Sequence, residues 1–303
     1  MNIEIEHILT GHADAIYSLC AGHENHLFYS GSADKFVGCW DDTTGLFLHP
    51  LAKTIGSIYS LYHDAERQIL YVGERKGIVL LIDLTKEHPP KAIQAHEGDV
   101  FSLIEDQKKQ IITGGGDGYL KVWTKDLQLI KAVHLSNKNI RSIRLSAATN
   151  EILVGLSDHT IRVLDADTFD TKQVLENHKN SIFTIEILED NRFVSAGRDA
   201  VFIVWQRENE QWIHSETISA HLYTVNHLTL SPNKKLLASG SRDKTIKIWD
   251  AKSLQLLKVL DRDKFPENHS HSVNRLLWLN DEVLISTGDD KKIISWKLIQ
   301  DSK

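Results

Sequence analysis

The sequence predicts an all-β fold in which seven four-stranded antiparallel sheets are arranged radially, a seven-bladed β-propeller. Three observations support this prediction. An apolar anchor residue recurs seven times along the 303 residues, short β-rich runs separated by turns fill each interval, and no segment shows a long apolar period of 3.6 residues. Length alone would suggest two domains, but one continuous repeat array predicts a single domain over residues 1–303.

Each anchor is an apolar residue followed, two or three positions on, by Ser, Thr, His or Arg and then by another apolar residue. The anchors are separated by 40 to 48 residues, a period typical of repeat architectures. They are Ile16, Ile58, Val100, Ile140, Ile182, Val225 and Val273. Because no helical pattern is present, a helical solenoid is excluded, and radially arranged sheets are the natural way to protect exposed sheet edges.

Each repeat has room for four strands joined by tight turns. In the sixth repeat, residues 236–240 and 245–249 read as two strands, and Asp243 and Lys244 lie in the turn between them. An Asp followed by a small or polar residue suits a narrow hairpin, and such pairs occur in five repeats. The pairs are Asp34-Lys35, Asp117-Gly118, Asp199-Ala200, Asp243-Lys244 and Asp290-Lys291.

The repeats resemble those of the WD-repeat (tryptophan-aspartate) family of β-propellers, and the resemblance covers nearly the whole chain. Gly11-His12 opens the first repeat, and Trp40-Asp41 and Trp249-Asp250 close two repeats with the dipeptide of the family. The other repeats carry half of the dipeptide, as Trp123, Trp205 and Trp296 without Asp, or as Ile82-Asp83 and Leu164-Asp165 without Trp. Five Trp residues in register with seven anchors make the resemblance specific.

The two ends of the chain are expected to share one sheet. The seventh repeat has only three strands, because the sequence runs just a few residues beyond Trp296. Residues 3–9 alternate like a strand and precede the first full repeat. In the WD-repeat family the first segment pairs beside the last blade, so the resemblance implies that residues 3–9 complete the seventh sheet.

Ser or Thr, His and Asp recur at fixed positions and invite comparison with a catalytic triad. An Asp stands six residues before each Trp, a hydroxyl residue ten before it, and a His four before the anchor. The five sets are His12, Ser30, Asp34 and Trp40; His96, Thr113, Asp117 and Trp123; His178, Ser195, Asp199 and Trp205; His221, Ser239, Asp243 and Trp249; and His269, Ser286, Asp290 and Trp296. A catalytic site needs one activated nucleophile, so fivefold repetition indicates a structural role, and no catalytic residue is predicted. The resemblance implies that indole, hydroxyl, imidazole and carboxylate form a buried hydrogen-bonded network in each set.

The second and fourth repeats depart from this pattern. The four positions hold Thr54, Val72, Lys76 and Ile82 in the second repeat, and Ser136, Val154, Asp158 and Leu164 in the fourth. Neither repeat can form the whole network. Replacement of the set by apolar packing is the simpler interpretation, and local flexibility is the alternative.

The candidate partner-binding residues lie at positions that differ between repeats, since function in a repeat array comes from what varies. In WD-repeat proteins the residue after the anchor often lines the top opening of the channel and contacts peptides. Aromatic and Arg side chains at this position match the composition of binding hot spots, and two further Arg beside the turn Asp would receive carboxylates. The candidates are Tyr17, Tyr59, Phe101, Arg141, Phe183, Asn226, Asn274, Arg198 and Arg242. The open alternative is that the aromatics only pack between sheets and the arginines are solvated.

The loop of residues 261–268 is the other variable feature, because the interval before Val273 is about six residues longer than its neighbours. This loop contains charged residues and a single aromatic, Phe265. Two interpretations stay open: the loop contacts a partner, or it is solvated with Phe265 turned inward.

Composition predicts a folded, soluble protein. There are 35 Lys and Arg against 41 Asp and Glu, so the net charge of −6 disfavours nucleic acid as a partner. The N-terminus lacks a signal-peptide pattern, no apolar stretch is long enough to span a membrane, and two cysteines suit a reducing compartment, so a cytoplasmic location is expected. No metal or cofactor is expected, because assigning His269 and Asp290 to the network leaves too few ligands, and Gly114 to Gly116 precede a hairpin and no helix.

These observations predict a non-catalytic scaffold that binds a protein or peptide of unknown identity at the top face of the propeller channel. An enzyme or small-ligand binder at the channel mouth is the alternative, for which only Asp99, His271 and Asp289 are uncommitted. Substrate recruitment to ubiquitin ligases, known for some WD-repeat proteins, is disfavoured because the residue after Trp249-Asp250-Ala251 is Lys252 and the signal requires Arg. The oligomeric state stays open.

Overall fold

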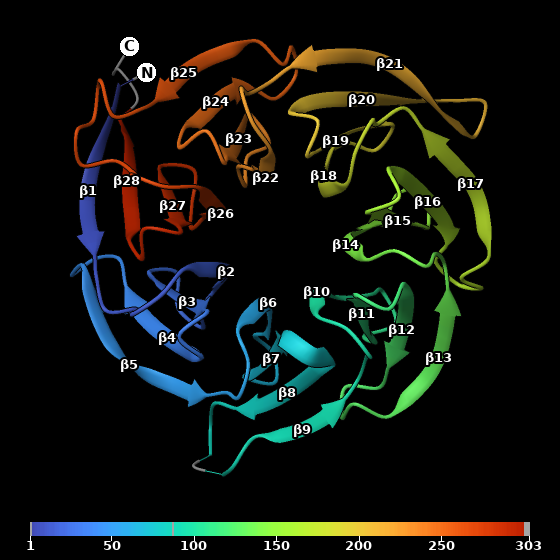
Figure 1. The fold of residues 1–303 in the computed structure, drawn as a ribbon, viewed down its shortest axis with the longest axis horizontal. Helices are drawn as coiled ribbons and strands as arrows, with labels where there is room; N and C mark the ends of the chain where they lie inside the picture. Colours follow the sequence, from blue (N-terminus) through green and yellow to red (C-terminus); the bar gives the residue numbers. More distant parts are fainter. Residues whose placement is uncertain (1, 87, 300–303) are drawn as a thin grey trace. The chain divides into compact units, whose positions relative to one another are not determined.

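The computed structural model describes residues 2–86 and 88–299, which form seven four-stranded antiparallel sheets (Figure 1). In six sheets the strands are hydrogen-bonded in chain order, and in the seventh β1 (Asn2–Leu9) lies beside β28 (Ile293–Ile299). Within the described residues, the helical conformation is limited to one short 3₁₀ turn, η1 (Arg75–Gly77). This is the strand arrangement of a seven-bladed β-propeller, so the fold class predicted from the sequence is confirmed.

The chain divides into two compact units, which are described separately. Unit 1 comprises residues 1–70, 82–88 and 226–303, and unit 2 comprises residues 71–81 and 89–225. The division passes through the second sheet, blade 2, which consists of β6 (Ile58–Asp64), β7 (Ile69–Glu74), β8 (Ile78–Asp83) and β9 (Lys91–Gln94).

Unit 1 contains blades 1, 6 and 7. Blade 1 consists of β2 (Ile16–Ala21), β3 (Leu27–Ser32), β4 (Phe36–Asp41) and β5 (Leu46–Lys53). Blade 6 consists of β22 (Val225–Leu230), β23 (Leu236–Ser241), β24 (Ile246–Asp250) and β25 (Leu256–Leu260). Blade 7 consists of β26 (Val273–Trp278), β27 (Val283–Gly288), β28 and β1.

Unit 2 contains blades 3, 4 and 5. Blade 3 consists of β10 (Val100–Glu105), β11 (Ile111–Gly115), β12 (Tyr119–Trp123) and β13 (Leu129–His134). Blade 4 consists of β14 (Ile140–Ser146), β15 (Glu151–Leu156), β16 (Thr160–Asp165) and β17 (Thr171–Glu176). Blade 5 consists of β18 (Ile182–Glu189), β19 (Arg192–Gly197), β20 (Val201–Glu208) and β21 (Gln211–Ser219). The second strands β11 and β15 are buried along their whole length, whereas the fourth strand β13 is mostly exposed.

The anchor of one blade packs on a glycine of the preceding blade. A Cβ added to Gly31 would overlap the side chain of Ile58, and one added to Gly114 would overlap the side chain of Ile140. Both anchor side chains are fully buried. A larger residue at either glycine would therefore push two sheets of the same unit apart. The repeated anchors of the sequence are repeated contacts between blades.

The tight turns hold their first Asp side chain against the backbone. Asp34 Oδ1 accepts a hydrogen bond from the Phe36 N–H over 2.9 Å, and Asp243 Oδ1 accepts one from the Thr245 N–H over 3.0 Å. The residue after the Asp adopts a left-handed backbone, with φ of 74° at Lys35. These turns match the hairpin chemistry that the Asp pairs predicted.

Strand β1 completes blade 7, as the sequence predicted. It pairs antiparallel with β28, from Asn2 opposite Ile299 to Leu9 opposite Ile293, and the two strands lie side by side in Figure 1. Ile3 is buried in a cluster with Trp296, and Leu9 is buried in a cluster that contains Trp40 of blade 1. The N-terminal strand thus joins the cores of blades 7 and 1.

Removal of residues 1–9 is expected to lower the unfolding temperature strongly, because it exposes the edge of β28 and uncovers two apolar clusters. The single change Leu9→Ala should cost about 2–5 kcal/mol, the usual range for deleting a buried Leu side chain. Denaturant unfolding of each variant checks this. Glu4→Ala, an exposed position on the same strand, is the control, and an unchanged midpoint for Leu9→Ala would contradict the role assigned to β1.

Candidate functional site

A chain of hydrogen bonds crosses blade 1 from the indole of Trp40 to the carboxylate of Asp34. The Trp40 Nε1–H donates to Ser30 Oγ over 2.7 Å, and the same oxygen lies 2.7 Å from His12 Nε2. His12 Nδ1 lies 2.7 Å from Asp34 Oδ2. Because the carboxylate only accepts, His12 carries its proton on Nδ1, and the Ser30 hydroxyl donates to Nε2. Every polar atom of the chain is thereby satisfied.

The same chain recurs in blades 3, 5 and 7. The indole donates to Thr113 Oγ1 over 2.9 Å, to Ser195 Oγ over 2.8 Å and to Ser286 Oγ over 2.8 Å. The hydroxyl oxygen lies 2.7 Å from His96 Nε2 in blade 3, 2.7 Å from His178 Nε2 in blade 5 and 2.9 Å from His269 Nε2 in blade 7. The Nδ1 atom of the same His lies 2.9 Å from Asp117, 2.8 Å from Asp199 and 2.9 Å from Asp290. In blade 6, Trp249 Nε1–H donates to Ser239 Oγ over 2.9 Å. His221, which stands four residues before the anchor as the other network His residues do, is buried.

The hydroxyls of these chains are unsuited to attack a substrate. Ser30, Thr113 and Ser195 are completely buried. Each hydroxyl oxygen accepts from an indole and bonds an imidazole within the blade, so no substrate reaches it. Nucleophilic catalysis needs an accessible oxygen beside a site for the oxyanion, and this geometry supplies neither.

The carboxylates of the chains are held in their ionised form. Burial raises the pKa of Asp117, but hydrogen bonds from His96 and from the N–H groups of Glu97 and Tyr119 outweigh burial and lower the pKa to about 2. The pKa values of Asp34, Asp199 and Asp290 are also lowered, since bonds from the partner His and from backbone N–H groups again exceed the opposing effect of burial.

Blades 2 and 4 replace the centre of the chain by apolar side chains. Val154 and Leu164 are fully buried together in blade 4, and Val72 and Ile82 are buried in blade 2. Blade 4 nevertheless keeps a shorter polar link at its end, because Ser136 Oγ–H donates directly to Asp158 Oδ2 over 2.6 Å. In blade 2, the Thr54 hydroxyl lies within hydrogen-bonding distance of the Lys35 and Gly56 carbonyls, and Lys76 belongs to η1.

Three candidate partner-binding residues form a stack in unit 2. The guanidinium of Arg141 lies 3.9 Å from the centre of the Phe101 ring and 4.5 Å from that of Phe183. The three residues come from the inner strands β14, β10 and β18, and all are half-buried. One cation thus contacts two aromatic rings, and such cation–π contacts stabilise the Arg141 side chain.

Two further candidates pair in unit 1. The rings of Tyr17 and Tyr59 lie 5.3 Å apart at an angle of 33°. Burial, and then the nearby Asp289 carboxylate, raises the pKa of Tyr17, so its hydroxyl stays protonated and able to donate. Both rings are half-buried, so part of each remains available at the surface.

The two Asn candidates brace neighbouring strands in unit 1. Asn226 Nδ2–H donates to Ser272 Oγ over 2.8 Å and to the Val273 carbonyl over 2.9 Å. Asn274 Nδ2–H donates to the Ile16 carbonyl over 3.1 Å and to Asp289 Oδ1 over 2.7 Å. Sequence reasoning assigned these amides to partner binding and missed their contacts with the next blade. The remaining candidates, Arg198 of unit 2 and Arg242 of unit 1, are exposed.

The loop of residues 261–268 turns its aromatic residue inward. The Phe265 ring meets the Trp296 ring edge to face, with centres 5.3 Å apart. Arg262 donates to the Pro266 carbonyl within the loop, and buried Asn268 donates to the Leu260 carbonyl over 2.9 Å. Of the two interpretations left open by the sequence, the structure shows the inward Phe265.

The residues left for an enzymatic alternative are each engaged in hydrogen bonds. Asp99 Oδ1 accepts from the Lys76 N–H in unit 2, while Asp289 accepts from Asn274 and His271 Nδ1 lies 2.9 Å from Ser270 Oγ in unit 1. Over residues 2–86 and 88–299, no group of three or more His, Cys, Asp or Glu is placed to hold a metal ion. Within the same residues, no helix is long and apolar enough to cross a membrane.

Comparison with known proteins identifies the repeats. The family described as WD domain, G-beta repeat matches residues 3–41, 88–124 and 212–250. These three matches, together with a relative named for its WD repeats, support a WD-repeat β-propeller family for this chain. The crystal structure of the WD40 β-propeller domain of Doa1 has a TM-score of 0.85 to this chain at 19% identity, and covers 99% of this chain and 98% of that one.

Two relatives show how far the similarity extends. A WD repeat domain-containing protein 83 homolog of Dictyostelium discoideum is 24% identical over 81% of this chain and 72% of that protein. A p21-activated protein kinase-interacting protein 1-like of Danio rerio is 26% identical over 65% of this chain and 53% of that protein. The chain spans about half the length of several other relatives. WD-repeat propellers are generally non-catalytic interaction scaffolds.

Acid is expected to destabilise the fold through the network carboxylates. A carboxyl whose pKa is about 2 in the fold and 3.8 when unfolded contributes stability that is complete above about pH 4 and is lost as the pH falls through 2. Asp117→Asn should reduce stability at neutral pH and flatten the decline between pH 4 and 2. Thermal unfolding across pH 2–7 measures this, with Asp263→Asn in the exposed loop as control. An equally steep decline in Asp117→Asn would refute the assignment.

Proposed function

We propose that this WD-repeat protein is a non-catalytic scaffold that binds a peptide or protein surface at the top face of the propeller channel. The observation that carries the proposal is the half-buried stack of Phe101, Arg141 and Phe183. Binding hot spots are enriched in aromatic and Arg side chains that are held rigidly before the partner arrives. The repeat scaffold supplies that rigidity, because each of the three side chains follows a fully buried anchor.

The chemistry of the stack points to an acidic group on the partner. Both the Phe101 and the Phe183 ring lie under the Arg141 guanidinium carbon, and a guanidinium that stacks on aromatic rings directs its N–H donors along its own plane. A carboxylate that approaches in this plane accepts two parallel N–H bonds, and apolar groups beside it would contact the rings. A Glu or Asp flanked by apolar residues meets both requirements.

The tyrosine pair of unit 1 supplies a second contact of the same character. Tyr17 and Tyr59 offer apolar ring surface with hydroxyl donors, and their mutual contact restricts both side chains in advance. Little conformational entropy is then lost when a partner docks. The name of the Danio rerio relative, an interacting protein of a kinase, also supports an interaction role.

The proposal extends to location and partner class. A cytoplasmic location is supported by Cys20 and Cys39, which are free thiols lying on β2 and β4 with β3 between them. The net charge of −6 supports a protein partner over nucleic acid.

Alanine substitution within each group is expected to remove a bound partner without unfolding the protein. Tyr17→Ala with Tyr59→Ala, and Phe101→Ala with Phe183→Ala, should each reduce recovery of the same partner at least tenfold in quantitative affinity purification from the native cell, since loss of a hot spot costs about 2 kcal/mol or more. Leu129→Ala and Leu256→Ala, which truncate exposed side chains on outer strands, should leave recovery unchanged.

Thermal unfolding of the same variants separates binding from folding. The unfolding temperature should stay within a few degrees of the parent, because all four rings are only half-buried. Full recovery of the partner by both double variants would exclude this face as the binding site.

A further inference from the structure

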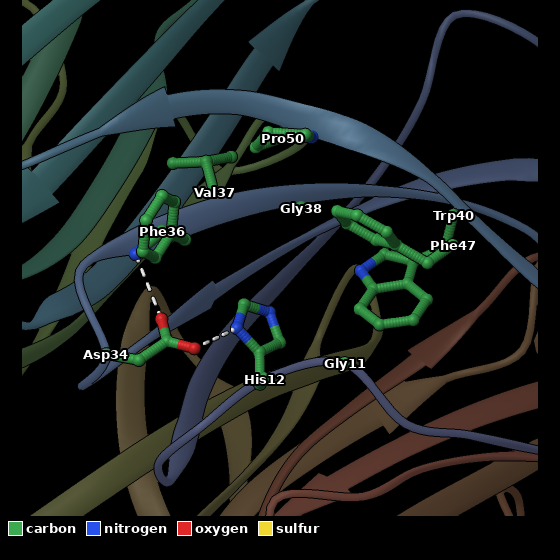
Figure 2. A pocket seen from close by; sticks show the side chains of 9 residues that line it. All are labelled: Gly11, His12, Asp34, Phe36, Val37, Gly38, Trp40, Phe47 and Pro50. Atoms are coloured by element: carbon green, nitrogen blue, oxygen red, sulfur yellow. Dashed lines mark hydrogen bonds and ion pairs between the residues drawn. The ribbon is translucent and has the colours of Figure 1, made fainter.

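Blade 1 has a cavity beside Trp40, which the repeat pattern does not predict. The cavity has a volume of about 230 Å³ and is bounded by the Trp40 and Phe47 rings on one side and by Phe36 on the other (Figure 2). The other lining residues are Gly11, His12, Asp34, Val37, Gly38 and Pro50. Phe36 is 36% exposed and Phe47 is 44% exposed, so the cavity is reached from solvent across the outer strand β5.

A glycine, Gly38, occupies the position two residues before the Trp and lines the cavity. At that position blades 3 and 6 have Lys121 and Lys247, and blades 5 and 7 have Ile203 and Ile294. A Cβ added to Gly38 would lie 2.8 Å from Trp40 Nε1, so the indole occupies space that a larger residue would need. Blade 1 therefore lacks the side chain that stands beside the indole in the other Trp-containing blades.

Blade 3 shows what an occupant of this position contacts. Lys121 Nζ donates to the Ala95 carbonyl over 2.6 Å and lies 5.7 Å from the centre of the Tyr119 ring. In blade 6, Lys247 Nζ lies 5.9 Å from the centre of the Trp249 ring. Twice in this chain, then, the ammonium of a Lys at this position lies over an aromatic ring of its own blade.

Blade 1 retains the partners of that ammonium without the lysine. Gly11 stands where blade 3 has Ala95, one residue before the network His, and Phe36 stands where blade 3 has Tyr119, four residues before the Trp. Both Gly11 and Phe36 line the cavity. The Phe36 ring attracts a cation already, since Lys53 Nζ of β5 lies 5.4 Å from its centre, although Lys53 does not line the cavity.

The carboxylate that lines the cavity also favours a cation, against the opposing charge of Lys53 near Phe36. Asp34 lines the cavity and is 2.7 Å from His12 Nδ1. Burial raises the pKa of Asp34, but the bonds from the Phe36 and Ala13 N–H groups and from His12 outweigh burial and keep it ionised. His12 is the other titratable group at the wall, and both its ring nitrogens are engaged within the blade.

We propose that this cavity receives a lysine side chain from a partner protein. The four-carbon stem packs against Trp40, Phe47 and Pro50, and the ammonium reaches the Gly11 carbonyl and the Phe36 ring, as Lys121 does within blade 3. The lysine of the partner thus takes the place of the side chain that Gly38 lacks.

The outer edge of blade 1 fits an extended partner segment. Strand β5 is the last strand of its sheet, and Leu46 and Leu48, on either side of Phe47, are 58% and 45% exposed. A strand added beside β5 would alternate its side chains between the two faces. A lysine on the Phe47 face then places its two neighbours on the face of Leu46 and Leu48, so a lysine between two apolar residues matches this edge.

Short lysine probes test the proposal directly. N-acetyl-lysine amide should shift one of the seven tryptophan indole N–H signals saturably, and should bind at least about tenfold more tightly than N-acetyl-norleucine amide, which has the same length of stem without the ammonium. Equal binding of the two probes would make the cavity a receptor for apolar side chains and overturn the proposal. The absence of a saturable shift with either probe would overturn it as well.

Variants locate the binding. Phe36→Leu removes the ring but keeps apolar bulk, and Phe47→Ala removes one wall, so each should weaken the lysine probe at least fivefold. Leu48→Ala, on the same strand but outside the cavity, is the matched control and should bind as the parent does. Thermal unfolding verifies that each variant is folded. Unaltered binding in both Phe36→Leu and Phe47→Ala would place the probe elsewhere.

A peptide probe separates a protein lysine from a free amine. Acetyl-Leu-Lys-Leu-amide should bind at least about tenfold more tightly than N-acetyl-lysine amide, because its leucines add contacts with Leu46 and Leu48. If the peptide binds no better than the single residue, the cavity takes free alkylammonium ions and the assignment to a partner protein is wrong. The site is independent of the stack around Arg141, so each can fail without the other.

Discussion

The hydroxyl group between an indole and an imidazole is the constraint on which each Trp-containing blade depends. In blade 1 the hydroxyl of Ser30, on β3, bonds the indole of Trp40 on β4. The same hydroxyl bonds His12, in the loop before β2, and His12 bonds Asp34 in the turn between β3 and β4. The indole, hydroxyl and imidazole each bond their neighbours in the chain, and the Asp also accepts from backbone N–H groups, so loss of one member leaves another unpaired at a cost of about 1–3 kcal/mol. This explains why blades 2 and 4 lose the indole and the hydroxyl together, as Val72 with Ile82 and Val154 with Leu164.

Because the interior of the blades is committed in this way, recognition falls to positions that the network leaves variable. The residues after the anchors are one such set, and in unit 2 they produce the stack around Arg141. The position two residues before the Trp is another, and in blade 1 Gly38 at this position lines the cavity. The two surfaces differ in charge preference, since one presents a guanidinium and the other an aromatic wall above an ionised Asp34.

The fold followed from the sequence because its determinants repeat. The anchors and the turn Asp residues each appear as a spacing, and the strand order agrees with them. The pairing of residues 3–9 with the last sheet was implied by the resemblance to the WD-repeat family. Contacts that occur once leave no such signal. The inward direction of Phe265, the bracing by Asn226 and Asn274, and the direct bond from Ser136 to Asp158 depend on side-chain placement in three dimensions.

The candidate sites were foreseeable only in part for the same reason. The spacing marked Arg141, Phe101 and Phe183 as variable residues beside buried anchors, but their stacking depends on how three adjacent strands converge. Gly38 could not be predicted as a site residue, because a single glycine in a strand has no characteristic sequence pattern. Its meaning follows from comparison with blade 3, where Lys121 occupies the same position.

The pairing of β1 with β28 also determines when blade 7 can form during synthesis. Strand β1 leaves the ribosome before any other strand of this chain, while its hydrogen-bonding partner is the last to emerge. Until then Ile3 and Leu9 lack the surfaces that bury them, and contacts between residues so distant in sequence form slowly. Blade 7 is consequently the last sheet to be finished during synthesis, and the nascent chain carries an unpaired, partly apolar strand that molecular chaperones would have to shield.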